Sequence, residues 1–140
     1  MQSNQWVQKE IFLSIQTKWQ QLANALAEST SSNCCLITQK TKNGLIVISA
    51  SEGESNNFAA NDIISLNDNV FCKKVVEQNE ALFVTSDAES NSLHNVCYCG
   101  HPITSPDGSV YGTICILDAS PTLPNEKVQS MVERYRFILE

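Results

Sequence analysis

The sequence predicts an α+β domain in which an antiparallel sheet is combined with two terminal helices. Three observations predict it: an apolar helical stripe near each end of the chain, a hairpin signal at Asn43-Gly44, and a second one at Pro106-Asp107-Gly108. With 140 residues, the chain has the size of a single domain. We therefore expect one domain over residues 1 to 140.

The first helix is predicted over residues 6 to 28, because this stretch holds no Gly or Pro and its apolar residues recur at spacings of three and four. The polar run from Ser29 to Asn33 ends it. The stripe consists of Val7, Ile11, Ile15, Trp19, Leu22 and Leu26.

Two strands follow, over residues 34 to 38 and 45 to 49, and the Asn-Gly turn joins them as an antiparallel hairpin. Residues 52 to 69 are rich in Ser, Asn and acidic residues, so we expect them to be irregular or only briefly helical. A short amphipathic pattern comes next at 70 to 78, and residues 81 to 85 are predicted to form a strand.

The best-defined hairpin joins strands 96 to 104 and 110 to 117 through Ser105-Pro106-Asp107-Gly108. In the second strand both alternating sets are largely apolar, so we expect both faces of the sheet to be covered. One set is Val110, Ile114 and Ile116, and the other is Tyr111, Cys115 and Leu117.

The last helix is predicted over residues 124 to 140, begun by Pro124 and Glu126. Because it reaches Glu140 without a stop signal, we expect the chain to be a fragment of a longer signalling protein. Its apolar stripe consists of Val128, Met131, Val132, Tyr135, Ile138 and Leu139.

The stretch from Val96 to Asp118 resembles the signature hairpin of bacterial GAF sensory domains. That signature is an aromatic-x-Gly-x-Pro strand, a Pro-Asp-Gly turn and a Gly-Thr-apolar-Cys-apolar-apolar-Asp strand. It is similar to Tyr98-Cys99-Gly100-His101-Pro102, to the turn at Pro106, and to the strand from Gly112. Upstream, Phe71-Cys72-x-x-Val75-Val76 and the strand Leu82 to Asp87 also look like the family, so the resemblance covers about residues 34 to 120.

The resemblance implies a GAF-like antiparallel sheet of five to six strands. The N- and C-terminal helices lie on one face, and short helices and loops roof a small-molecule pocket on the other. It also implies a regulatory role, in which ligand state or partner contact is passed through the terminal helices to an attached output domain. Such an output domain would be a histidine kinase of two-component signalling or a diguanylate cyclase of cyclic-di-GMP signalling.

Five residues are the candidate ligand contacts: Phe71, Cys72, Cys97, Cys99 and His101. The last three alternate along one predicted strand, so their side chains should share a face. Thiolate and imidazole are zinc or iron ligands, but there is no Cys-x-x-Cys motif, and packing or pocket lining is the favoured interpretation over metal. We expect this set to floor the pocket and Phe71 and Cys72 to face it from the roof.

No catalytic residue is predicted, because a base, a nucleophile and an orienting group do not come together in any motif. Motifs of the cyclic-nucleotide-binding and bilin-binding branches are not found, so no cofactor is named and the ligand stays an unidentified small molecule. One branch of GAF proteins reduces free methionine sulfoxide with pocket cysteines. The alternative function is therefore a thiol-based redox sensor or an enzyme of that kind.

The composition limits the partners. A net charge of −6 and the lack of any Lys/Arg cluster beyond Lys73-Lys74 argue against nucleic acid. The chain has no span-length apolar run and no signal peptide, which predicts a cytoplasmic protein with six reduced cysteines and no membrane contact. We expect a homodimer through the terminal helices, because Trp6, Phe12 and Phe137 lie partly off the apolar stripes.

Overall fold

The structure is a computed structural model that describes residues 2–53, 58–67, 70–86, 95–117 and 125–139. Before residue 14, and at 85, 86, 95–97 and 125, the description covers the backbone alone. The elements follow the order α1-β1-β2-β3-α2-β4-β5-β6-α3, and all six strands join one antiparallel sheet in the order β3-β2-β1-β6-β5-β4. The predicted α+β class is confirmed, and so is the antiparallel sheet predicted to have five to six strands, which has six.

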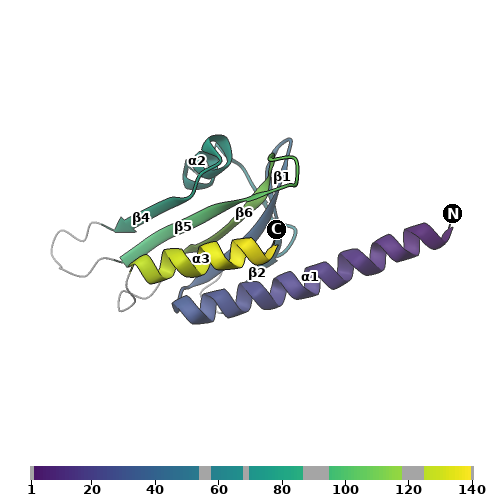
Figure 1. The fold of residues 1–140 in the computed structure, drawn as a ribbon, viewed down its shortest axis with the longest axis horizontal. Helices are drawn as coiled ribbons and strands as arrows, with labels where there is room; N and C mark the ends of the chain where they lie inside the picture. The colour runs from purple at the N-terminus through teal and green to yellow at the C-terminus, as the bar shows by residue number, and fades with distance from the viewer. Residues whose placement is uncertain (1, 54–57, 68–69, 87–94, 118–124, 140) are drawn as a thin grey trace.

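The helices form where the apolar stripes predict them. The first, α1, spans Gln2–Thr30 and α3 spans Asn125–Leu139, while the short amphipathic pattern becomes α2, Val70–Gln78. Figure 1 shows α1 and α3 side by side on one face of the sheet, with the N-terminal part of α1 running beyond the sheet edge. At the other end of α1, the Thr30 hydroxyl donates to the Leu26 carbonyl at 2.7 Å within the last turn.

Both predicted hairpins are present. Gly44 at the start of β2 has a φ of 142° and Gly108 between β5 and β6 has a φ of 88°, conformations that favour glycine. In the second turn the Asp107 carboxylate accepts from the Ser109 hydroxyl at 2.6 Å. A short strand, β3, forms within the segment expected to be irregular. The strands are β1 Cys34–Thr41, β2 Gly44–Ala50, β3 Ile63–Ile64, β4 Leu82–Ser86, β5 Asn95–Thr104 and β6 Val110–Leu117.

Apolar side chains are buried on both faces of the sheet, as expected. The helix-side cluster lies under α1 and α3 and consists of Ala23, Leu26, Cys35, Ile37, Cys99, Ile103, Ile114, Ile116, Val128 and Val132. The α2-side cluster lies on the opposite face and consists of Cys34, Leu36, Leu45, Val47, Ala50, Ile64, Cys72, Val75, Val76, Tyr98 and Cys115. Each face thus has a packed core of its own.

Two β-bulges change the faces that simple alternation predicts. In β6, Val110 pairs with Thr104 and Gly112 pairs with Ile103, which leaves Tyr111 as the extra residue. In β2, Val47 and Ser49 pair with consecutive residues of β1, which leaves Ile48 as the extra residue. An extra residue shifts the alternation by one position. The predicted grouping of Val110 with Ile114 is therefore wrong: Tyr111 packs on the helix-side cluster and Val110 on the α2-side cluster.

Candidate functional site

The predicted pocket floor lies on the face opposite to the one expected. Cys99 is a member of the helix-side cluster, where it is 2% exposed. His101 follows it by two residues and pairs with Ile114, so it shares the same face and is half-buried there. The assignment of Cys99 and His101 to the floor of an α2-side pocket is therefore wrong. Alternation groups these residues, but it does not say which layer of helices they meet.

Cys97, the third residue of the predicted set, stands where β5 breaks its register with β4. Its neighbours Val96 and Tyr98 pair with the consecutive residues Thr85 and Val84, so Cys97 is the extra residue of a β-bulge. Its side chain lies outside the described residues.

Phe71 and Cys72 lie on the α2 side, where they meet Tyr98 instead of the predicted set. The Cys72 Sγ atom is 3.5 Å from the Tyr98 hydroxyl, and the Phe71 ring centroid is 5.3 Å from that of Tyr98. Tyr98 is 1% exposed, and its ring occupies the space that a Cβ atom on Gly100 would need. The glycine therefore makes room for an aromatic ring that fills the space between α2 and the sheet.

The buried thiols differ in acidity. A hydrogen bond with Cys115 lowers the pKa of the Cys72 thiol below its ordinary value, and the Tyr98 hydroxyl acts in the same direction while burial opposes both. The pKa of Cys115 is raised well above its ordinary value by the same hydrogen bond and by burial. Burial also raises the pKa of Cys99, to about 12. Only Cys72 among these three gains thiolate character.

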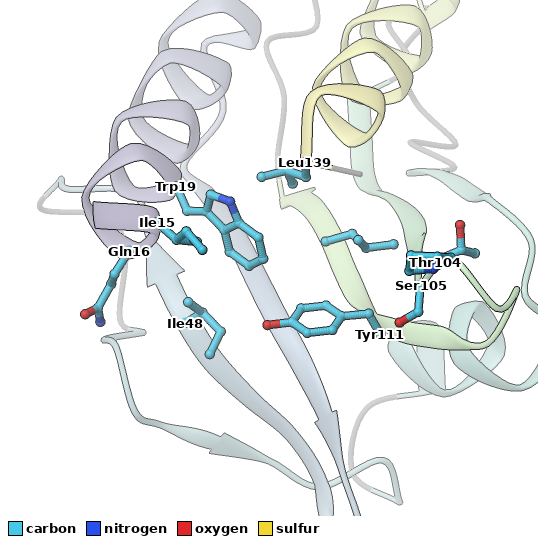
Figure 2. A pocket seen from close by; sticks show the side chains of 10 residues that line it. Ile15, Gln16, Trp19, Ile48, Thr104, Ser105, Tyr111 and Leu139 are labelled. Atoms are coloured by element: carbon cyan, nitrogen blue, oxygen red, sulfur yellow. The ribbon is translucent and has the colours of Figure 1, made fainter. Parts of the chain in front are cut away.

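A cavity of about 290 Å³ lies between the two terminal helices and the sheet. Its floor is formed by the two bulge residues Ile48 and Tyr111 together with Ile103 of β5. Figure 2 shows Trp19 and Ile15 of α1 on one side and Leu139 of α3 on the other. The remaining lining residues are Gln16, Thr104, Ser105 and Pro106. We name this space the helix-side cavity.

Two aromatic rings shape the wall of the helix-side cavity. Trp19 meets Tyr111 edge to face, with ring centroids 5.8 Å apart and an angle of 89° between the planes. Partial burial raises the pKa of the Tyr111 hydroxyl, which keeps this group protonated. No sequence pattern predicts this cavity, because its lining comes from five elements and its floor residue Tyr111 reaches this face through a bulge.

The family model for the GAF domain matches residues 14–133, most of the chain. The chain belongs to the GAF domain family. No curated protein matches its sequence closely enough to count as a relative. The membership confirms the resemblance read from the hairpin at Tyr98 to Leu117 and from the Phe71-Cys72 segment.

Solved structures with the same fold come from proteins of different kinds. The GAF domain of an Acinetobacter phosphoenolpyruvate-protein phosphotransferase has a TM-score of 0.65 at 14% identity, with 89% of this chain and 78% of that chain covered. The type II free methionine-R-sulfoxide reductase of Thermoplasma acidophilum has a TM-score of 0.62 at 16% identity, with 91% of this chain and 94% of that chain covered. The blue-light absorbing form of the Thermosynechococcus elongatus PixJ GAF domain has a TM-score of 0.56 at 13% identity, with 91% of this chain and 85% of that chain covered. At these identities the likeness shows the fold alone.

The described part of this GAF domain offers neither a cluster of metal ligands nor a membrane-spanning helix. Over the residues that the structure describes, no three His, Cys, Asp or Glu side chains gather in a way that would hold a metal ion. Within the same residues, none of the helices is both long and apolar enough to span a bilayer.

Proposed function

We propose that this GAF domain is a regulatory sensory module that binds a small ligand, dimerises, and controls an attached signalling output domain through its terminal helices. The observation that carries the proposal is the construction of the helix-side cavity, whose walls include Ile15 and Trp19 of α1 and Leu139 of α3. A molecule in this cavity contacts both helices. If it binds one helix arrangement better than another, it shifts the population toward that arrangement, which is what signalling along the chain requires.

The proposed homodimer uses α1 and α3. Phe137 is 75% exposed and Ile138 is 63% exposed, although both are large apolar side chains on adjacent positions of α3. Ile15 of α1 is also exposed, at 42%. Grouped apolar side chains on a surface are typical of protein interaction sites. The side chains of Trp6 and Phe12, which also suggested a dimer, lie outside the described residues.

We expect the double substitution Phe137→Glu and Ile138→Glu to convert the dimer to a monomer, measured as mass by light scattering. The reason is that two charges would have to be desolvated in the contact. The matched control is Ile63→Glu with Val70→Glu, two exposed apolar residues on β3 and α2, which should leave the mass unchanged. Val132 is unsuitable for this test, because it is fully buried in the helix-side cluster. A dimer that survives the α3 substitutions would refute this interface.

Cysteine chemistry supports a cytoplasmic location for the proposed module. None of the five cysteines whose side chains are described is in a disulfide, and each is at most 3% exposed. Reduced, buried thiols are typical of proteins in a reducing compartment.

A thiol-based redox function is the second candidate, and the contact between Cys72 and Cys115 is the observation that favours it. This contact lowers the pKa of Cys72, which raises the fraction of reactive thiolate. The shared fold with the Thermoplasma reductase is compatible with such a function. Against it stands the 1% exposure of Cys72, because a reactive thiol also needs access.

Alkylation with iodoacetamide distinguishes the two functions. In a Cys97→Ser variant, which leaves only the five described cysteines, we expect less than one thiol to react in the native state during the time in which the unfolded chain reacts fully. Burial blocks the reagent at each position. If instead Cys72 reacts at the rate of a free thiol, and reaches its maximal rate at a lower pH than free cysteine does, the redox function is favoured. A Cys72→Ser variant identifies the reacting residue.

A further inference from the structure

We propose that the helix-side cavity is the ligand site of this domain, and that it takes an uncharged aromatic molecule of about two fused rings with one hydroxyl or similar polar group. This inference deepens the proposed function and rests on it for the regulatory consequence. The cavity lies on the sheet face opposite α2, so it is distinct from the pocket that the family resemblance predicted.

The size of the cavity sets the size of the ligand. Its volume is about 290 Å³. An apolar cavity of roughly 150 Å³ accepts a single benzene ring, and small-molecule sites begin at roughly 300 Å³. The space opens to solvent beside Ile15, which is 42% exposed, so a small molecule can enter it from the surface. Two fused rings match it.

The two bulges show how the chain builds the floor. Ile48 and Tyr111 are each the extra residue of a bulge, in β2 and β6, and both line this one cavity. Bulges occur often beside functional sites, where they turn a side chain to a new direction. Without the bulge in β6, alternation from Ile114 would turn Tyr111 toward α2. The bulge in β6 therefore brings Tyr111 into this space, where it meets the extra residue of β2, Ile48.

The chemistry of the lining sets the ligand class. Trp19 and Tyr111 present aromatic surface, and Ile48 and Ile103 present aliphatic surface, which suits stacking and edge contacts with a flat ring system. Among the described residues that line the cavity, none is Asp, Glu, Lys, Arg or His. A charged ligand would lose its hydration without gaining a partner charge, so an uncharged one is favoured. The Tyr111 hydroxyl, which stays protonated, offers one polar contact.

The rival occupant is a side chain from a second copy of the protein. Exposed Phe137 and Ile138 lie beside the cavity-lining Leu139, so a dimer contact through α3 would form next to this space. The two occupants differ in an observable way, because a side chain from a second copy fills the cavity only at protein concentrations that give dimer. Small-molecule binding at one equivalent per chain in the monomeric Phe137→Glu, Ile138→Glu variant excludes that rival.

The test is titration with 2-naphthol at neutral pH, followed by Trp19 fluorescence in a Trp6→Phe variant and by calorimetry. The chain has two tryptophans, so this variant leaves Trp19 alone as the reporter. We expect saturable binding of one equivalent. We expect 2-naphthalenesulfonate, the same ring system with a negative charge, to bind at least about tenfold more weakly, because its charge finds no partner among the described lining residues.

Substitutions locate the site. Ile48→Trp fills the cavity and should abolish saturable binding, while the matched control Ile63→Trp, on an exposed residue of β3 that does not line it, should bind as the parent does. Tyr111→Phe keeps the ring and should weaken binding by about two- to tenfold through loss of the hydroxyl contact. Circular dichroism confirms that each variant is folded. If Ile48→Trp is not, a smaller change at the opposite wall, Leu139→Phe, takes its place.

The outcomes separate the site from the proposed function. No saturable binding of 2-naphthol, equal binding by the folded cavity-filling variant, or equal binding of the sulfonate overturns the site, even if the α3 substitutions show that the dimer exists. Binding that follows the expected pattern supports the site. If the protein then proves monomeric, the proposed dimer fails and the site stands.

Discussion

Gly112→Ala is expected to abolish stable folding or to lower the free energy of unfolding by about 3 kcal/mol or more. A Cβ atom at this position would overlap the carbonyl group of Thr38 and approach the Cα atom of Gln39. These are backbone atoms of β1, the strand that pairs with β6 in the middle of the sheet. A clash with a side chain can be relieved by a rotamer change, but this one requires two central strands to separate.

The measurement is chemical denaturation of the variant beside a Gly53→Ala control. A Cβ atom at Gly53 has no atom of the described residues within 4 Å, so the control should unfold at nearly the same denaturant concentration as the parent. The comparison holds the chemical change constant and varies only the surroundings. If the two variants have equal stability, the close approach of β1 to β6 at Gly112 is wrong.

The elements of the fold could be predicted from the sequence, because each has a local cause. The glycine of each turn, Gly44 and Gly108, adopts a positive φ that other residues avoid, so the hairpins carry clear signals. The helical stripes of α1 and α3 repeat over several turns. The strand β3 has only two residues, Ile63 and Ile64, and therefore no periodicity that would predict it.

The faces of the sheet could be predicted only in part. Both alternating sets of β6 are apolar, so burial on two sides followed from the pattern, but hydrophobicity did not say which set meets the helices. Gly100 indicates where the Tyr98 ring lies, because a glycine two residues after Tyr98 leaves room for that ring on the α2 side. This arrangement places Cys99 under the terminal helices.

The helix-side cavity could not be predicted, since it depends on register. The bulges at Ile48 and Tyr111 appear in the pairing of β2 with β1 and of β6 with β5, which are relations between strands and not properties of either segment. Trp19 was correctly placed on the apolar face of α1. The space between this face and the sheet, near the end of α3, depends on how α1 and α3 pack on the sheet, and the sequence does not show this packing.

Tyr98→Ala is expected to lower the free energy of unfolding by about 3 to 5 kcal/mol, the range for removing a large buried aromatic side chain. Tyr98 is 1% exposed and fills the space between α2 and the sheet, where it contacts Phe71 and Cys72. Its loss should also loosen α2 more than α1 or α3. Hydrogen exchange of the amides of Val75 and Val76 is the measurement for this second effect.

Tyr98→Phe is the control that separates the ring from its hydroxyl. It keeps the packing and removes only the 3.5 Å contact with the Cys72 sulfur. Because sulfur is a weak hydrogen-bond partner, we expect the free energy of unfolding to fall by about 1 kcal/mol or less.

Burial raises the pKa of Tyr98 well above its ordinary value of 10.0. Above that value the unfolded chain releases this proton while the folded chain retains it, so stability falls as pH rises. The phenylalanine variant lacks this contribution and should lose less stability than the parent in alkaline solution. Equal alkaline sensitivity of the two proteins would show that the pKa of the Tyr98 hydroxyl is not raised by burial. A Tyr98→Ala variant as stable as Tyr98→Phe would show that the ring does not hold α2 against the sheet.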